Sequence, residues 1–260
     1  MIKFGISTAS LYPMETEKAL RLLGENGVKN TEIFFNATEE TKKEFVLELK
    51  KIAEHYGINV VSVHPTMSLA ESFMLFSAYE RRRREGIDQY KRYGEITAEL
   101  GAKYVIMHGG KPNGVLDDEG YCERFLQISD AVLENGGILL QENVVNYRAG
   151  SIDFMKAMVT HLGDRAVFCL DIKQSKRNGY DPMDVLDAVG NRVKHIHISD
   201  NTPQKDCLLP TMGSYNFTVF FEKCRNKGIE AYAISEVYRN AYDDCSEIFL
   251  CQRKFELNNP

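Results

Sequence analysis

The sequence predicts an α/β protein, a single closed (β/α)8 barrel, from three observations. Eight short runs of β-branched and apolar residues alternate with longer amphipathic stretches along the whole 260-residue chain. No linker rich in Pro, Gly or Ser and no shift in composition divides the chain, so residues 1–260 are expected to form one barrel domain. A doubly wound open sheet is the alternative, but neither GxGxxG nor GxxxxGK[ST] follows the first apolar run, where a nucleotide-binding sheet would carry it.

The predicted elements follow one another regularly. Strands are expected at residues 2–7, 30–35, 58–63, 103–108, 137–142, 166–171, 193–199 and 230–236. Helices are expected between them, for example at residues 14–27, 38–57 and 77–101. Several helical stretches end in a glycine just before the next strand, where a left-handed cap is typical: Gly27, Gly57, Gly101 and Gly228.

Composition and charge indicate which partners and which cellular compartment are expected for the protein. The formal net charge of -5 disfavours nucleic acid and anionic membrane surfaces as partners, and the RRRR run at 81–84 suits a solvated helix face. The six cysteines form no CxxC pair, which indicates a reduced, cytoplasmic protein without a disulfide framework. No signal peptide and no membrane span of about 20 apolar residues is expected.

Metal-capable side chains stand where the predicted strands end. A barrel builds its site from the carboxyl ends of its strands, so these side chains are expected to converge. Each follows an apolar run, next to a core where an unpaired charge is costly. They are His64, His108, Glu142, Asp171 and Glu236, and the seventh strand adds His197 within HIHISD.

Each of these residues also has a plainer interpretation. A single strand-end histidine is often structural, and Asp171 could cap the turn before KQSKRNG. Alternation along the strand sends His195 and His197 to the same face, so His195 is either a second ligand or a core histidine. His197 is favoured as the ligand because it lies nearer the functional end. Six such residues on six strands nevertheless indicate a shared site.

The favoured ligand set contains three carboxylates and one imidazole. Glu142, Asp171, His197 and Glu236 suit Mn²⁺ or Mg²⁺, and accommodate Co²⁺ or Zn²⁺ less selectively. Such an ion acidifies the proton on a carbon between a carbonyl and a hydroxyl. Glu142 and Glu236 would then act as the acid and the base.

In these residues the chain resembles the xylose isomerase-like TIM barrel superfamily. This superfamily includes sugar and sugar-phosphate isomerases and epimerases, inosose dehydratases and endonuclease-IV-type apurinic endonucleases. The segments that carry the resemblance are VVSVHP, VIMHGG, QENV, LDIKQ, HIHISDN, KDCLLPTMGSYNF and SEVY, in family order. In its epimerase branch, the resemblance implies that Glu142, Asp171, His197 and Glu236 hold one divalent ion, and that the two glutamates transfer protons.

The chain departs from the nuclease branch of this superfamily. Where that branch has a histidine three residues after the aspartate, this chain has Gln174, and its later Asp-x-His reads Asp206 and Leu208. Glutamine is a poor zinc ligand and leucine is none, so a three-zinc site looks incomplete. His64 and His108 would serve the nuclease, but in the isomerase branch comparable residues contact the substrate.

The same departure bears on the substrate. A histidine at the position of Gln174 often touches the sugar in the epimerase branch, so Gln174 and its neighbour Lys173 are expected to contact the ligand. Lys173 and Lys111 could bind a phosphate or carboxylate group, or could be solvated loop lysines. Asp200 could orient its loop or a ligand hydroxyl.

The sequence therefore favours a metal-dependent isomerase or epimerase of carbohydrate metabolism. Its substrate would be a small carbohydrate, a sugar, sugar phosphate or related polyol, and protons would move through an enediolate. Dehydration by the same route is a close variant. The alternatives are an endonuclease-IV-like zinc phosphodiesterase on abasic DNA and a catalytically inactive ligand-binding barrel. Substrate, direction of reaction and homo-oligomeric state stay open.

Overall fold

A computed structural model describes residues 2–66 and 68–259. Its eight parallel strands pair in chain order and β8 pairs with β1, which closes the barrel and excludes the open sheet. The strands end within one or two residues of their predicted positions. They are β1 (Ile2–Ser7), β2 (Asn30–Phe34), β3 (Asn59–His64), β4 (Tyr104–Met107), β5 (Ile138–Glu142), β6 (Phe168–Asp171), β7 (Val193–Ile198) and β8 (Ala231–Ser235).

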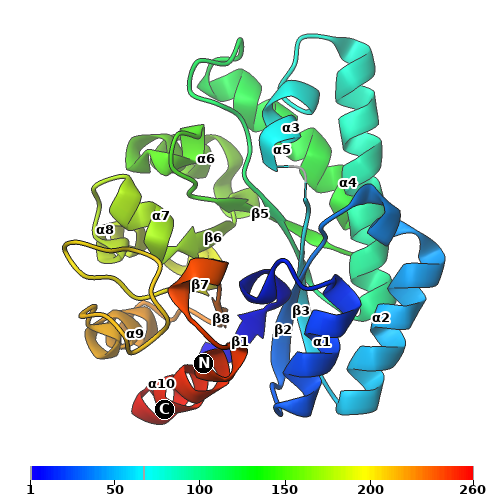
Figure 1. Ribbon diagram of the computed structural model, residues 1–260. Helices are drawn as coiled ribbons and strands as arrows, with labels where there is room; N and C mark the ends of the chain where they lie inside the picture. Colours follow the sequence, from blue (N-terminus) through cyan, green and yellow to red (C-terminus); the bar gives the residue numbers. More distant parts are fainter. Residues whose placement is uncertain (1, 67, 260) are drawn as a thin grey trace.

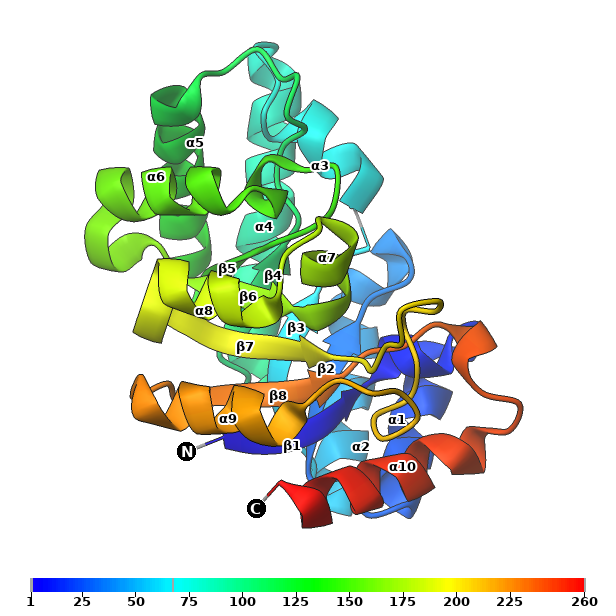
Figure 2. The same ribbon diagram turned by 90° about the vertical axis from the view of Figure 1, so that its left-hand side faces the viewer.

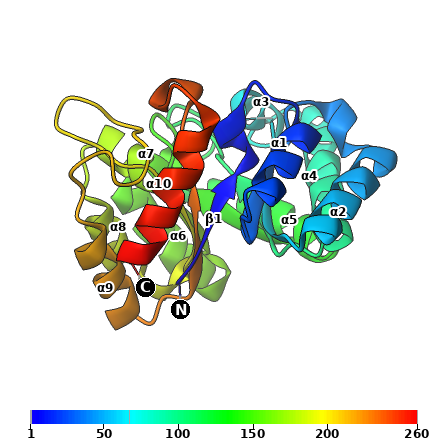
Figure 3. The same cartoon turned by 60° about the horizontal axis from the view of Figure 1, so that its bottom comes forward.

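Helices surround the barrel (Figure 1). Figure 2 shows β7, β8 and β1 running in the same direction, and Figure 3 shows the start of β1 near the end of the last helix. The α-helices are α1 (Thr16–Glu25), α2 (Lys43–Tyr56), α3 (Ser68–Met74), α4 (Glu80–Leu100), α5 (Asp118–Leu133), α6 (Ile152–Leu162), α7 (Ile172–Arg177), α8 (Pro182–Val189), α9 (Phe217–Asn226) and α10 (Cys245–Asn258).

The predicted glycine caps are confirmed. Gly27, Gly57, Gly101 and Gly228 all have positive φ angles, between 63° and 77°. The helix predicted at 38–57 is divided, because Lys42 has extended backbone between a 3-10 turn at Thr38–Thr41 and α2. In the RRRR run at the start of α4, Arg81, Arg82 and Arg84 are exposed and Arg83 is half-buried, which agrees with a largely solvated segment.

The side chains inside the barrel form layers, because alternate residues of each strand point inward. Side chains two residues apart on one strand point to the same side of the barrel wall. A small buried cluster of Tyr104, Ile106, Leu140 and Cys169 lies on the inner side, separate from the larger core between strands and helices. Two residues further along their strands come Glu142 and Asp171. The apolar cluster thus forms a floor beneath the polar strand ends.

Two further observations bear on the sequence predictions. All six cysteines are free thiols, as the spacing predicted. Among the described residues, no helix combines the length and the apolar character that a membrane span requires.

Candidate active site

The four ligands predicted by the sequence meet at the carboxyl end of the barrel. One ligand atom from each of Glu142, Asp171, His197 and Glu236 lies within 4.8 Å of the others. The Nδ1 atom of His197 is 3.3 Å from Glu142 Oε1, 3.7 Å from Glu236 Oε2 and 3.9 Å from Asp171 Oδ2. The imidazole therefore faces three carboxylates at once.

Asp171 has two separate roles, one for each oxygen. Its Oδ1 accepts the backbone N–H of Gln174 at 2.9 Å and caps α7, as the plainer interpretation proposed. Its Oδ2 points toward the other ligands and has no hydrogen-bond partner. Burial raises the pKa of Asp171 to about 6, and Glu142 and Glu236 add to the rise while Lys173 opposes it.

The chemistry of this donor set fits a divalent cation. Glu142 Oε2 and Asp171 Oδ2 are buried without a hydrogen bond, and each keeps a free lone pair for a ligand although His108 and Lys173 approach them at 3.3 Å. Three carboxylates and one imidazole offer mostly oxygen, which suits Mn²⁺ or Mg²⁺ and also admits Co²⁺ or Zn²⁺.

Lys173 lies beside two of these carboxylates. Its Nζ is 3.3 Å from both Asp171 Oδ2 and Glu236 Oε2, and 4.6 Å above the ring of Tyr238. Burial alone would lower the pKa of Lys173, but the attraction of Asp171 and Glu236 holds it well above its ordinary value. Its side chain is only 2% exposed, so the interpretation as a solvated loop lysine is wrong.

His64 and His108 approach the other face of Glu142. Their Nε2 atoms lie 3.9 Å and 3.3 Å from Glu142 Oε2, and their rings are 4.8 Å apart. His64 Nδ1 is 3.2 Å from the carbonyl oxygen of Pro65, which fixes the ring. Both histidines therefore reach the site, as their strand-end positions suggested.

Sequence reasoning missed Glu71, which supports His108. Glu71 lies on α3, accepts hydrogen bonds from Tyr90 Oη (2.6 Å) and Gly109 N (2.8 Å), and is 3.5 Å from His108 Nδ1. Burial opposes the charged imidazolium, but Glu71, together with Glu142 and Glu236, raises the pKa of His108 to about 9. Glu71 lies on a helix and not at the end of a strand, so a search for polar residues at strand ends could not identify it.

Sequence reasoning also missed Glu32, a fully buried carboxylate on β2. Its Oε2 lies 3.1 Å from His195 Nε2 and 3.2 Å from His197 Nε2. Burial alone would raise the pKa of Glu32, but attraction to His197 and contact with His195 hold it well below its ordinary value. The available signal was a glutamate inside the otherwise strand-like NTEIF.

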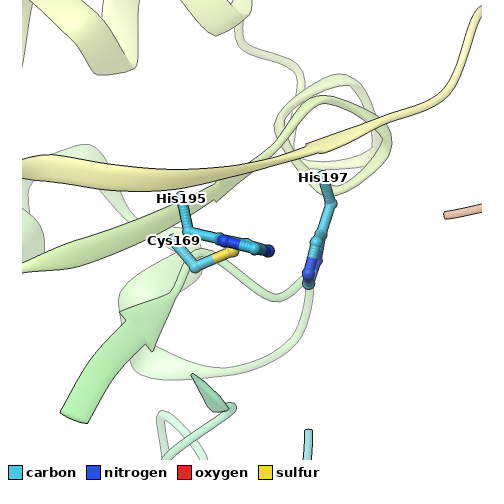
Figure 4. Close-up of side chains that lie close together, drawn as sticks. All are labelled: Cys169, His195 and His197. Atoms are coloured by element: carbon cyan, nitrogen blue, oxygen red, sulfur yellow. The ribbon is translucent and has the colours of Figure 1, made fainter. Parts of the chain in front are cut away.

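His195 lies one layer below His197, two residues earlier on β7. It is fully buried, and its ring stands perpendicular to that of His197, with centroids 5.1 Å apart. Figure 4 shows His195 and His197 projecting from β7, with Cys169 beside His195. His195 and Glu32 thus form a polar layer directly under the candidate ligands.

A cavity of about 720 Å³ opens above this constellation. This volume suits a small molecule. Gln174 lines it, but the side-chain oxygen of Gln174 also accepts the backbone N–H of Val145 at 3.0 Å. The functional groups along its wall include His64, His108, Glu142, Lys173, Gln174, Glu236, Tyr238 and Arg239.

Three other polar residues singled out by the sequence have different surroundings. Asp206 pairs with Arg177 Nε at 2.5 Å and lines a separate surface depression. Lys111 lies 3.6 Å above the ring of Tyr147. Asp200 accepts backbone N–H groups from Gly213 and Tyr215 and so orients its loop.

Comparisons with known proteins agree with this architecture. The family model described as "Xylose isomerase-like TIM barrel" matches residues 20–248. An uncharacterized protein of Mycobacterium leprae (strain TN) is 20% identical over 271 residues, covering 95% of this chain and 92% of that protein. Fructoselysine 3-epimerase of Escherichia coli O157:H7 is 21% identical over 250 residues, covering 91% and 90%.

Solved structures share the fold over nearly the whole chain. An L-ribulose 3-epimerase aligns with a TM-score of 0.81 and 14% identity, covering 99% of this chain and 94% of that one. The 3-keto-D-glucoside 4-epimerase from E. coli aligns with a TM-score of 0.76 and 17% identity, covering 99% and 100%. Together with the matching family model, this means that the chain belongs to the xylose isomerase-like TIM barrel family.

Proposed function

We propose that the protein is a divalent-metal-dependent enzyme that isomerises or epimerises a small sugar, sugar phosphate or related polyol. The observation that carries the proposal is the convergence of Glu142 and Glu236 with Asp171 and His197 at the base of a cavity large enough for a small molecule. The names of similar proteins, among them fructoselysine 3-epimerase and L-ribulose 3-epimerase, support a carbohydrate substrate and favour epimerisation.

Glu142 and Glu236 are the proposed proton-transfer groups. One glutamate removes the proton from a carbon next to the substrate carbonyl, which gives an enediolate, and the other returns a proton. Their surroundings differ, because Glu142 faces His108 and His64 whereas Glu236 faces Lys173. Different neighbours separate the proton affinities of two carboxylates, as separate acid and base roles require.

Asp171 and His197 would complete the cation site with the two glutamates. The bound ion, with Mn²⁺ or Mg²⁺ favoured, would supply Lewis-acid polarisation of the substrate carbonyl. His64, His108, Lys173 and Gln174 line the same cavity, so they are the proposed substrate contacts. The ammonium of Lys173 is positioned to donate to a substrate oxygen beside Glu236.

The nuclease alternative has weaker support. A third zinc ion would need ligands near Gln174 and Asp206, but Gln174 is bonded to a backbone amide and Asp206 pairs with Arg177. The net charge of -5 also disfavours binding to DNA.

Solvent-deuterium exchange tests the proposal directly. Metal-loaded protein in D₂O is expected to exchange a carbon-bound proton of at least one member of a panel of ketoses and sugar phosphates. Glu142→Gln and Glu236→Gln should each reduce this exchange by at least a hundredfold, consistent with the loss of an acid or base. Glu134→Gln, at the exposed end of α5, is the matched control and should exchange normally. Nicking of abasic DNA without exchange into any sugar would overturn the proposal, as would exchange that survives both site variants.

A further inference from the structure

Glu32 occupies an unusual position for a carboxylate, because it is fully buried inside the barrel. Four polar side chains surround it. Ser62 Oγ donates to Oε2 at 2.8 Å and Ser7 Oγ donates to Oε1 at 3.2 Å. His195 Nε2 and His197 Nε2 approach Oε2 at 3.1 Å and 3.2 Å. Such a group is retained in a core only when its partners satisfy it.

The contact with His197 determines which of its ring nitrogens carries the proton. A carboxylate can only accept, so the Nε2 atom that faces Glu32 carries the hydrogen. The Nδ1 atom of a neutral ring then carries the lone pair. This is the atom that faces Glu142, Asp171 and Glu236 at 3.3–3.9 Å.

We infer that Glu32 is a positioning residue for the cation site, holding His197 in the Nε2–H tautomer and orienting its Nδ1 lone pair toward the three carboxylates. The inference deepens the proposed function, since it rests on the same site. Histidine ligands commonly donate their second N–H to a carboxylate, which fixes the ring and raises its basicity, and removal of that partner typically weakens metal binding 10–100-fold.

Glu32 also accounts for the polar layer beneath the site. Ligand atoms of Cys169, His195 and His197 lie within 4.8 Å of one another, as a separate metal site would require (Figure 4). Yet both imidazoles already direct Nε2 at Glu32. One carboxylate therefore approaches both histidines, and its hydrogen bond goes to His197.

Direct measurement of metal binding tests the inference without any substrate. Glu32→Gln keeps the size of the side chain but removes its charge, so the affinity for Mn²⁺, measured by calorimetry, should fall about 10–100-fold. Asp200→Asn is the matched control: it also neutralises a buried carboxylate, but Asp200 accepts backbone N–H groups of its own loop and does not line the cavity. Its Mn²⁺ affinity should stay within about threefold of the unaltered protein. Thermal unfolding of all three proteins would confirm that they are folded.

Nitrogen NMR of the unaltered protein provides a second readout that needs no folded Glu32 variant. With ¹⁵N-histidine labelling and diamagnetic Mg²⁺ or Zn²⁺, the His197 signals, assigned by their loss in His197→Asn, should show a proton on Nε2 and none on Nδ1.

The outcomes separate this inference from the proposed function. Equal Mn²⁺ affinity in the unaltered protein and a folded Glu32→Gln variant would overturn the role of Glu32 alone, as would a proton on Nδ1 in the metal-loaded protein. A protein that binds no divalent ion overturns the metal site and this inference together.

Discussion

At the scale of single residues, Lys173 is the group that most alters the charge of the site. Asp171 and Glu142 are buried and Glu236 is 13% exposed, and the ammonium of Lys173 lies 3.3 Å from Asp171 and from Glu236. It stabilises them in the absence of an ion, but it repels any cation that binds the same oxygens. Lys173 and a divalent ion therefore compete electrostatically for Asp171 and Glu236.

This competition predicts the effect of Lys173→Met. Removal of the ammonium should tighten Mn²⁺ binding about tenfold, roughly 1.4 kcal/mol, because the repulsion disappears while the carboxylates remain. Turnover of the sugar should fall, since the variant loses a proposed substrate contact. Titration of Mn²⁺ followed by electron paramagnetic resonance measures the affinity. Lys173→Arg retains the charge and should bind Mn²⁺ about as the unaltered protein does. Weaker binding by the methionine variant would contradict the competition.

Strand periodicity explains which site residues the sequence could predict. Glu142, Asp171 and Glu236 end apolar runs, and parallel strands bring their carboxyl ends together. Glu32 lies within a strand, where its partners come from three other strands and cannot be read from the local sequence. Glu71 depends on the path of the β3–α4 connection, which no local pattern determines.

At the scale of elements, the connection between β4 and α5 holds His108 in place. The backbone just after His108 packs closely against the side chains of Tyr121 and Gln141. Gly109 follows His108 with φ of 89°, and a Cβ there would overlap Tyr121 Oη and lie 3.0 Å from the Gln141 amide. Tyr121 Oη donates to Gln141 Oε1 at 2.7 Å and accepts from Gly110 N at 3.3 Å. Only glycine fits this arrangement without moving the network.

Gly109→Ala is therefore expected to destabilise the protein by about 2–4 kcal/mol, from overpacking added to left-handed backbone strain. Chemical denaturation measures the free energy of unfolding. Gly101→Ala is the matched control, since Gly101 has φ of 69° but its Cβ would meet no described atom within 4 Å. That change should cost only about 1 kcal/mol, the strain of the backbone alone. Equal losses in the two variants would show that the Tyr121–Gln141 network does not constrain the loop.

Element length determined which helices the sequence could predict. The amphipathic pattern of α4 extends over many turns, whereas α3 and α7 are one to two turns long. A periodicity of 3.6 residues cannot be recognised in so few positions, so the sequence pattern predicts neither α3 nor α7. Both short helices carry residues of the candidate site, Glu71 on α3 and Lys173 on α7.

At the scale of the whole molecule, closure of the barrel joins the two ends of the chain. β1 pairs with β8 over five residue pairs, and α10 contacts β1. Loss of β1 or β8 would open the sheet, so we propose that residues 1–260 unfold as one domain. A single calorimetric transition is expected, and two separable transitions would contradict it.

Metal binding should be visible in the same unfolding experiment, because the candidate ligands come from four different strands or strand ends. An ion held only by the folded barrel, at a free concentration about 100 times its Kd, adds about 2.7 kcal/mol to the free energy of unfolding. For a chain of this size that corresponds to a rise in Tm of roughly 5–10 °C. Chelation with EDTA should remove the rise, and added Mn²⁺ should restore it. Glu142→Gln lacks one ligand carboxylate, so its Tm should barely respond to Mn²⁺. If this variant responds as strongly as the unaltered protein, the stabilising ion binds elsewhere on the molecule.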